Sequence, residues 1–436
     1  MGLIVEKSHK LEKSFWREKL SGENSAKKMV LKYSSPPKEI PFTANEYRKR
    51  LSRVRESMGR EKIDLLFLSA PASLFYISGY QAEWYQSQSP KIWPPASGIA
   101  IHVDHDDFID FDTEEEEVLS RYTTISTDTR IYRETAETTG MLPWIVQELK
   151  KEGWLPGTVG LEMWSYRPNR AVSETFQTAL EKEGCRVIDG TDIVRKVRAV
   201  KSPQEIAYTE KAAQIAEVGH KTAIETIRPG MTELAVYGEI VNAMAKAGGE
   251  NPAIPVLVTS GPKCACLHAL ASRKKIKKEE TVNIDICGVF NRYHANMART
   301  YSLGKPNPDV AKVVELSARA FDVIAKLIRP NLPVAEFNER MKAYYQEAGI
   351  AQDSWWFGGY ELGIAFPPDW VGQFVYDVQI DPGNQLFVPG TVVNYESNFY
   401  LPHKVGVSYQ INTLVFTEER AKILGEIPND IIVIER

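Results

Sequence analysis

Apolar positions recur with two different spacings in the first half of the chain, and these spacings predict which segments are helices and which are strands. Short runs of consecutive apolar residues predict buried strands, and longer runs with apolar residues three or four apart predict helices. The predicted helices are Thr43–Met58, Leu142–Lys151 and Arg170–Glu183, and the predicted strands are Asp64–Leu68, Gly98–Val103, Thr158–Glu162 and Arg186–Asp189. The acidic run Glu114–Glu117 predicts the solvated start of another helix. Alternating strands and helices are typical of an α/β domain.

A hairpin is predicted in the second half of the chain. Its first strand is Thr281–Cys287, its turn Gly288–Arg292 and its second strand Tyr293–Ser302. Asp285 lies inside the first strand and Asn296 inside the second. A carboxylate in a buried strand is costly unless a partner compensates it. Asp285 is therefore a candidate functional residue, and the structural alternative is that it accepts hydrogen bonds from the backbone or from an arginine.

The hairpin has a second copy in the sequence. Val392–Glu396 matches Thr281–Asp285, so that Glu396 aligns with Asp285. Upstream of each hairpin a helical segment repeats, at residues 227–248 and 328–349. An internal repeat predicts two structurally related units. We expect two helix-plus-hairpin units whose equivalent positions bring Asp285 and Glu396 to one cleft.

Local composition predicts three parts of the chain. Residues 1–42 form a polar N-terminal arm that ends in the Ser-Ser-Pro-Pro linker, residues 43–200 form an N-terminal domain, and residues 201–436 form a second domain. The break between the two domains falls in Val197–Pro203.

Composition and charge describe an ordinary globular chain of 436 residues with a formal net charge of −4. That charge gives no general attraction to nucleic acid or to an anionic membrane, and no apolar run has the length of a membrane span. The polar N-terminus argues against a signal peptide, and the four cysteines suggest a reducing compartment, so we expect a cytoplasmic protein. Cys264 and Cys266 have no partner pair at zinc spacing and are interpreted as structural.

Residues 78–95 form a loop-like segment with a high density of aromatic residues, among them Trp84, Tyr85 and Trp93. Aromatic faces bind organic cations well. The segment is a candidate lid over a ligand, and the alternative is a packed surface loop or a dimer contact.

Several motifs together resemble the creatinase/aminopeptidase P/methionine aminopeptidase superfamily. The motifs are Arg195–Ile206, Arg228–Glu233, Leu267-His268, Asp285 through Thr300, Tyr360–Gly363 and Glu396. The resemblance spans about residues 43–420. It implies an α/β (α+β) fold, with a creatinase-type N-terminal α/β domain followed by a pita-bread domain with an internal pseudo-twofold repeat.

This chain departs from the metal ligands of the superfamily. The metallopeptidases hold two divalent metals with Asp, Asp, His, Glu and Glu. Asp285 stands at the first position, Asn296 at the second, Tyr360 at the histidine (GYELG instead of GHGxG), Glu396 at the fourth, and Gln410 is the best match for the last. Amides are poor ligands for hard divalent cations. We therefore expect no cofactor and a metal-free site, and the alternative is a single residual metal at Asp285 and Glu396.

Metal-free members of the superfamily offer the nearest analogy. Creatinase hydrolyses a C–N bond with a histidine that matches His268 in position, although its glutamate is replaced here by Ala298. Ectoine hydrolase, which opens a cyclic amidine, has a GYSIG…YPPDW-like stretch similar to Gly359–Trp370. The chain therefore resembles the creatinase and ectoine hydrolase members more than the peptidases.

The chemistry of the candidate residues agrees with this analogy. His268 can exchange protons near neutral pH, and Asp285 and Glu396 can orient it or bind a cation. Asn296, Gln410 and Tyr360 supply neutral donors and acceptors, with Tyr360 also a candidate catalytic residue. Further candidate substrate contacts are Glu361 and His403, and for His403, as for His294 at the equivalent hairpin position, an exposed turn residue is the alternative.

The resemblance also implies a homodimer in which the loop with Trp84, Tyr85 and Trp93 reaches the active site of the other subunit. Three functions remain open. The first is a metal-independent hydrolase of a non-peptide C–N bond in a small cationic or zwitterionic compound. The second is a lyase on a small onium zwitterion such as dimethylsulfoniopropionate. The third is an Xaa-Pro peptidase-like protein or a non-catalytic, ligand-binding pseudo-peptidase. Turnover of small molecules discriminates among them.

Overall fold

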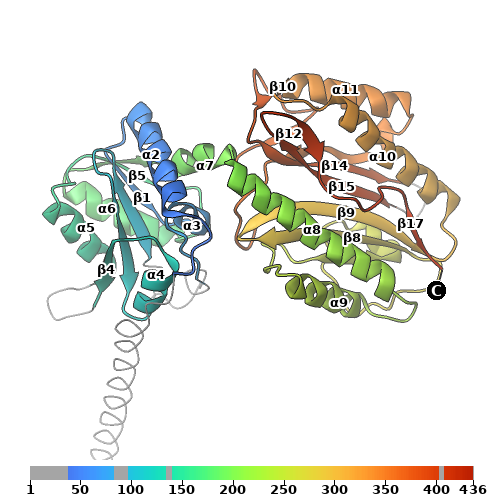
Figure 1. Cartoon of the computed structure of the whole chain (residues 1–436), viewed down its shortest axis with the longest axis horizontal. Helices are drawn as coiled ribbons and strands as arrows, with labels where there is room; N and C mark the ends of the chain where they lie inside the picture. The colour runs from blue at the N-terminus through green and yellow to red at the C-terminus, as the bar shows by residue number, and fades with distance from the viewer. Residues whose placement is uncertain (1–37, 83–96, 134–139, 402–406, 436) are drawn as a thin grey trace, which may run out of the picture. The chain divides into compact units, whose positions relative to one another are not determined.

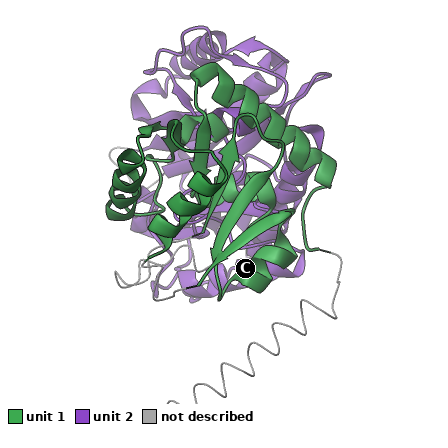
Figure 2. Ribbon diagram, turned by 90° about the vertical axis from the view of Figure 1, so that its left-hand side faces the viewer, with its two compact units in different colours: residues 1–194 green, residues 195–436 purple. Residues whose placement is uncertain are grey.

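The computed structural model describes residues 38–82, 97–133, 140–401 and 407–435, which divide into two compact units, Met1–Val194 and Arg195–Arg436 (Figures 1 and 2). Helix α7 (Thr191–Ala199) contains the division between them. Four of the predicted substrate contacts, Trp84, Tyr85, Trp93 and His403, lie outside the described residues, as does the N-terminal arm up to residue 37.

The first unit contains one mixed sheet with the strand order β4-β3-β2-β1-β5-β6. Its strands are β1 (Leu65–Leu68), β2 (Gly98–His102), β3 (Phe108–Thr113), β4 (Asp128–Tyr132), β5 (Thr158–Leu161) and β6 (Arg186–Asp189). Its helices are α2 (Ala44–Glu61), α3 (Pro71–Ser78), α4 (Glu117–Thr123), α5 (Met141–Lys151) and α6 (Arg170–Lys182). The strands and helices predicted from apolar spacing are confirmed close to their predicted bounds. β3 was not predicted, because the buried Asp110 and Asp112 interrupt its apolar run.

Local sequence explains the ends of helix α2. Thr43 caps its N-terminus by accepting a hydrogen bond from the backbone N–H of Glu46. The helix ends at Lys62, which takes the left-handed conformation with φ 56°. Tyr47, Leu51, Val54 and Met58 form its buried stripe.

The second unit contains a sheet with the strand order β12-β11-β14-β15-β9-β8-β7. Two further strands join this sheet: β16 pairs with β15, and β17 pairs with β9. The strands are β7 (Leu257–Ser260), β8 (Thr281–Phe290), β9 (Tyr293–Leu303), β11 (Ser354–Tyr360), β12 (Val375–Asp377), β14 (Val392–Tyr400), β15 (Val407–Phe416), β16 (Ala421–Ile423) and β17 (Ile432–Ile434), with the small pair β10 (Leu332–Pro333) and β13 (Leu386–Phe387). The helices are α8 (Pro203–Thr226), α9 (Glu233–Lys246), α10 (Pro308–Leu327) and α11 (Val334–Glu347), with the short 3₁₀ helices η2 (Gly261–Ala265) and η3 (Ala351–Asp353).

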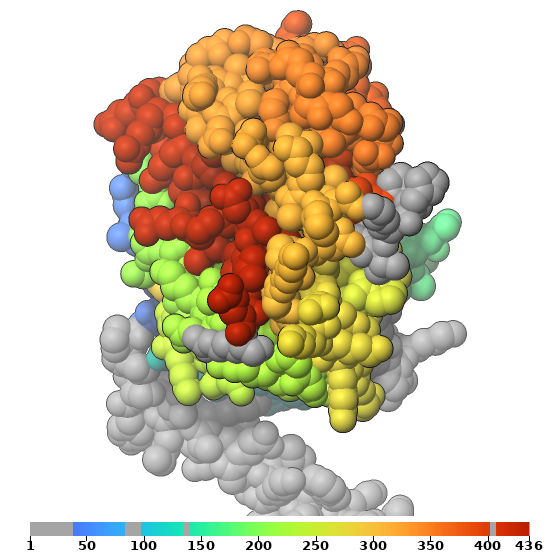
Figure 3. All heavy atoms as spheres, turned by 90° about the vertical axis from the view of Figure 1, so that its right-hand side faces the viewer, coloured from blue at the N-terminus to red at the C-terminus, as the bar shows by residue number. Residues whose placement is uncertain are grey.

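The predicted repeat is confirmed in this unit. Helices α8 and α9 pack on the hairpin β8–β9, and α10 and α11 pack on the hairpin β14–β15 (Figure 1). The hairpins join through β9 and β15, where Ala298 pairs with Ile411. In Figure 3 the C-terminal segment lies at the surface between the two repeats, and β17 pairs there with β9.

The turn of the first hairpin differs from the prediction. It contains only Asn291 and Arg292, both with positive φ (47° and 63°), and the strands on either side extend to meet it. Such two-residue turns match the twist of a hairpin. Gly288 was assigned to the turn but lies in β8, where a Cβ atom would come within 1.9 Å of the carbonyl oxygen of Ala212 in α8. This glycine allows the helix to approach the strand.

Among the described residues, no helix is both long and apolar enough to cross a membrane. In the second unit, the helices cover one face of the sheet with apolar residues. Alternation along each strand therefore places Asp285 of β8, Asn296 of β9 and Glu396 of β14 on the opposite face.

Candidate active site

The two acidic residues lie in one row of paired residues across the sheet. Asp285 pairs with Ala298, Ala298 with Ile411, and Ile411 with Glu396. Gly358 completes the row beside Glu396. Residues paired in this way point to the same face of a sheet. Asp285 and Glu396 are almost fully buried, with exposed fractions of 4% and 6%.

A chain of side-chain amides connects the two acids. Asn296 Nδ2 donates to Asp285 Oδ1 at 2.6 Å. Asn394 Nδ2 donates both to Asn296 Oδ1 at 3.2 Å and to Glu396 Oε1 at 3.0 Å. Asn398 Nδ2 donates to Glu396 Oε2 at 2.8 Å. These hydrogen bonds are consistent with the sequence prediction that Asn296 belongs to the site.

Tyr409 completes the set of donors around Asp285. Its hydroxyl donates to Asp285 Oδ2 at 3.1 Å. All four carboxylate oxygens of Asp285 and Glu396 therefore accept a hydrogen bond from an amide or a hydroxyl. Asn394, Asn398 and Tyr409 were missed from the sequence. The two asparagines could have been found from the sequence, because each lies two residues from Glu396 in a buried strand. Residues two apart in a strand face the same side of the sheet.

Tyr360 is part of an aromatic wall beside Glu396. Its hydroxyl accepts a hydrogen bond from Trp370 Nε1 at 2.9 Å, and the negative charge of Glu396 adds to the burial that raises the pKa of Tyr360. Its ring stacks on Trp356 with 6.3 Å between centroids and an interplanar angle of 12°. Asp377 Oδ2 holds the Trp356 indole N–H at 2.9 Å. Trp356 and Trp370 were not identified as site residues from the sequence. Trp356 lies on the same strand as Tyr360, four residues before it, whereas the loop that carries Trp370 meets Tyr360 only in the fold.

Burial dominates the protonation of this site. It raises the pKa of Glu396 to about 8, with the negative charge of Asp285 as the second cause. It raises the pKa of Asp285 to about 6, although the hydrogen bonds from Asn296 and Tyr409 act in the opposite direction. Burial also raises the pKa of Tyr360 and of Tyr409 well above the usual range. The site can therefore hold a proton on Glu396 near neutral pH.

His268 lies on an exposed loop at the edge of this face. The neighbouring Leu267 packs in a cluster with Ala298, Tyr409 and Ile411. The His268 ring contacts Trp355 edge to face, with 5.5 Å between ring centroids. Within the described part of the chain, it makes no hydrogen bond to Asp285 or Glu396. His268 is therefore solvent-accessible and adjacent to the site, without direct contact with either acid.

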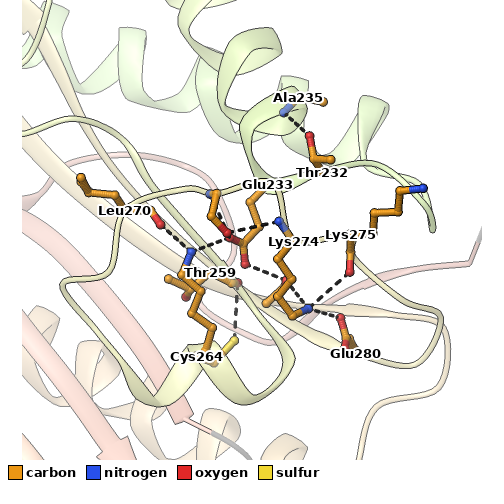
Figure 4. A network of polar contacts seen from close by, with 12 residues as sticks. Thr232, Glu233, Ala235, Thr259, Cys264, Leu270, Lys274, Lys275 and Glu280 are labelled. Atoms are coloured by element: carbon orange, nitrogen blue, oxygen red, sulfur yellow. Dashed lines mark hydrogen bonds and ion pairs between the residues drawn. The ribbon is translucent and has the colours of Figure 1, made fainter.

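A buried polar network anchors the loop that carries His268 (Figure 4). Glu233, at the start of α9, accepts hydrogen bonds from Ser260 at 2.8 Å, Ser272 at 2.8 Å and Lys263 at 2.6 Å. Lys274 connects Ser260 to Glu280 through two contacts of 2.8 Å. The loop is thereby fixed at both ends, before and after His268.

Gln410 does not belong to the site, contrary to the prediction. It pairs with Ser397 and points with it to the helix-covered face, where Ser397 contacts Ser317 of α10. Ile411 is the residue on β15 that pairs with Glu396 and points to the same face of the sheet. A one-residue difference in alignment exchanges the two faces of a strand. Both polar side-chain atoms of Gln410 are buried without a partner among the described residues.

Glu361 and His294 also have structural partners. Glu361 was predicted to contact the substrate, but its carboxylate forms a buried ion pair with Lys201 instead. His294 is fully buried, not an exposed turn residue, and it contacts the backbone of Arg292 at 2.8 Å and Ala253 at 3.1 Å. Burial lowers the pKa of His294 to about 3.

The donor set does not fit the dinuclear metal centre of the metallopeptidases. Among the residues that the structure describes, Asp285 and Glu396 are its only carboxylates, and the positions of the other ligands hold Asn296, Tyr360 and Ile411. The carboxylate oxygens already accept hydrogen bonds from groups that a metal would have to displace. Outside the undescribed segments, no three His, Cys, Asp or Glu side chains are grouped closely enough to hold a metal ion.

Comparison with known families and proteins agrees with this fold. Residues 207–419 match the metallopeptidase family M24, and residues 50–200 match the creatinase/prolidase N-terminal domain. The chain belongs to this superfamily, and the predicted family and fold class are confirmed.

Individual relatives include both hydrolases of small compounds and peptidases. The chain is 26% identical to the ectoine hydrolase of Halomonas elongata, over 90% of this chain and 98% of the relative. It is 24% identical to the Xaa-Pro dipeptidase of Pyrococcus furiosus, over 88% and 100% of the two chains. The solved X-Pro aminopeptidase of Thermotoga maritima superposes with a TM-score of 0.71 at 21% identity, over 88% and 100% of the two chains.

Proposed function

We propose that this protein is a metal-independent hydrolase of a non-peptide C–N bond in a small cationic or zwitterionic compound. The observation that carries the proposal is the amide-bridged pair Asp285 and Glu396, which stands where the metallopeptidases hold their metals. Two buried acids beside an aromatic wall suit a small organic cation. The similarity to an ectoine hydrolase over nearly the whole chain supports the same class of substrate.

The proposed reaction divides its work among the residues of the site. Asp285 and Glu396 bind the cationic part of the substrate, and Tyr360 donates to a polar group or a developing oxyanion. The oxygen of a water molecule forms a bond to the carbon of the C–N bond. His268 takes the proton that the water loses and returns it to the nitrogen as the C–N bond breaks.

A second candidate function is a lyase on a small onium zwitterion. One observation favours it: Tyr360 lies close enough to Glu396 for the two to influence each other's pKa, whereas His268 makes no hydrogen bond to either acid among the described residues. A lyase would use the carboxylate or the tyrosine to remove a proton next to the leaving group. The carbon–heteroatom bond would then break with formation of a C=C bond.

A turnover screen separates these functions. The purified protein is incubated with ectoine, creatine and dimethylsulfoniopropionate, and with an Xaa-Pro dipeptide, and the products are identified by mass spectrometry. The proposal expects a product heavier than the substrate by one water molecule, or its two fragments. An unsaturated product would support the lyase, and cleavage of the dipeptide alone would contradict both. Binding without turnover would support a non-catalytic protein.

The metal content of the purified protein is expected to be far below one equivalent per chain. The reason is that amide and hydroxyl donors occupy the carboxylate oxygens. Elemental analysis measures the content, and activity is compared before and after treatment with a chelator. About two divalent ions per chain, together with activity that a chelator abolishes, would contradict this expectation.

We also propose a homodimer in which the loop with Trp84, Tyr85 and Trp93 completes the site of the other subunit. This proposal rests on the aromatic composition of the loop and on its family resemblance. Chains carrying Trp84→Ala and chains carrying His268→Asn are each expected to be nearly inactive. Their mixture should recover up to about a quarter of the activity, because a mixed dimer has one intact site. No recovery after verified exchange of subunits would contradict action across the interface.

A further inference from the structure

Glu361 is unusual for its position in the motif. It occupies the place of a glycine in the GHGxG pattern and of a serine in the GYSIG pattern, and it directly follows Tyr360. The carboxylate is 2% exposed and pairs with Lys201, which is 5% exposed. Lys201 Nζ also donates to the carbonyl of Ala199 at 3.1 Å. Removing a carboxylate from water is costly, so a buried acid at a position that otherwise has a small residue must make compensating interactions.

Glu361 closes the neck of a loop. Its backbone N–H donates to Phe374 O at 2.9 Å, and its carbonyl accepts from Gly372 N at 2.8 Å. Its carboxylate Oε2 accepts a hydrogen bond from the backbone N–H of Gln373. Gly372 leaves room for this contact, because a Cβ atom there would lie 1.8 Å from Glu361 Oε2. Three hydrogen bonds from one residue therefore hold together the two ends of residues 362–372.

The segment before Lys201 braces the same loop from outside. Arg195 donates to Gly372 O at 3.3 Å, and Arg198 donates to Ile364 O at 3.3 Å. The backbone N–H of Lys201 donates to Gly390 O at 2.9 Å. Lys201 thus approaches Glu361 from a backbone that is itself fixed, which limits the freedom of the ion pair.

The loop closed by Glu361 carries Trp370, and Trp370 donates to the Tyr360 hydroxyl at 2.9 Å. We propose that Glu361, held by Lys201, is a positioning residue that keeps Trp370 against Tyr360 and so directs the Tyr360 hydroxyl toward Glu396. The catalytic part of this inference rests on the proposed function, while the closure of the loop does not depend on it.

Two matched double variants test the role of the carboxylate. Lys201→Met with Glu361→Gln removes both charges but keeps a side-chain oxygen for Gln373 N–H. Lys201→Met with Glu361→Met removes the charges and the acceptor at similar side-chain length. A buried ion pair replaced by neutral residues of similar volume often leaves stability little changed. The thermal midpoints of the two variants are compared first, to establish that both fold.

Hydrogen–deuterium exchange measured by mass spectrometry then follows the loop directly. We expect amides of residues 362–374 to exchange at least ~10-fold faster in the Met/Met variant than in the Met/Gln variant, since opening of the neck exposes them. Amides of the hairpin 281–303 should exchange alike in both. Equal exchange of the loop in the two variants and the wild type would overturn the proposal, whatever the substrate is.

Turnover of the substrate found in the screen gives the second measurement. The Met/Met variant should lose kcat with a much smaller change in KM, and the Met/Gln variant should retain most of its kcat. Adding Trp370→Phe to the Met/Met variant should lower kcat only slightly further, because both changes interrupt the same series of contacts. Additive losses would overturn the positioning role. If no substrate is found, the proposed function fails but the exchange result still decides the loop closure.

A single Glu361→Gln substitution covers the case in which the Met/Met variant does not fold. It keeps the side-chain length and an oxygen for Gln373 N–H, but it leaves the buried Lys201 without its carboxylate partner and so removes the ion pair that holds residue 361. Exchange should then accelerate in residues 362–374 relative to the wild type and remain unchanged in residues 281–303. Uniform acceleration across both segments, or none in the loop, would overturn the proposal.

Discussion

Replacement of His268 by asparagine is expected to lower turnover about 100-fold or more, the usual contribution of general acid–base catalysis. Asparagine retains polarity and approximate size but has no basic group near pH 7. The affinity for substrate should change much less, because Asp285, Glu396 and the aromatic wall remain. Steady-state kinetics measures both effects as kcat and KM.

Glu396→Gln is the matched comparison for that experiment. Burial raises the pKa of Glu396 to about 8, and a bound cation would favour its ionised form, which glutamine cannot provide. The substitution preserves the shape, so it should mainly weaken the binding of a cationic substrate and raise KM. Near-normal turnover in His268→Asn would exclude the proposed role of His268. Proton transfer would then pass to Glu396 or Tyr360, two neighbouring groups that influence each other's pKa.

The contribution of Asp285 and Glu396 to the free energy of unfolding is expected to fall as the pH rises from about 4 to 8. Burial raises the pKa of Glu396 from 4.5 to about 8 and that of Asp285 from 3.8 to about 6. Between these limits the folded chain holds more protons than the unfolded chain, so stability decreases with rising pH and levels off above pH 8. One such group contributes a slope of at most about 1.4 kcal/mol per pH unit.

Substitution of each acid isolates its share of this dependence. Between pH 6 and 8, Glu396→Gln should become steadily more stable relative to the wild type, because it removes the cost of ionising Glu396. Asp285→Asn should reduce the slope between pH 4 and 6 to the part that Glu396 contributes, and also weaken the slope above pH 6, since the charge of Asp285 contributes to the raised pKa of Glu396. Denaturant unfolding at several pH values measures these slopes. Wild-type and Glu396→Gln curves that stay parallel from pH 6 to 8 would contradict the expected protonation.

The repeat and the two acids could be predicted because they are written in local sequence. The match of Val392–Glu396 to Thr281–Asp285 needs no tertiary contact, and the structure places both segments at equivalent positions of their hairpins. The assignment of Gln410 failed for a physical reason. A strand presents successive residues to opposite faces, so an alignment uncertain by one residue cannot decide whether Gln410 or Ile411 faces the site.

By itself, the sequence determined the superfamily, the fold class, the acids Asp285 and Glu396, and the replacement of other metal ligands by Asn296 and Tyr360. Motif order and residue type are properties of the sequence and can be recognised without a three-dimensional structure. Only the tertiary structure decided what surrounds those acids. Tyr409 reaches Asp285 across more than a hundred residues, Trp370 reaches Tyr360 from a loop, and Lys201 neutralises Glu361. These contacts depend on strand register and loop closure, which bring together residues that no local pattern relates.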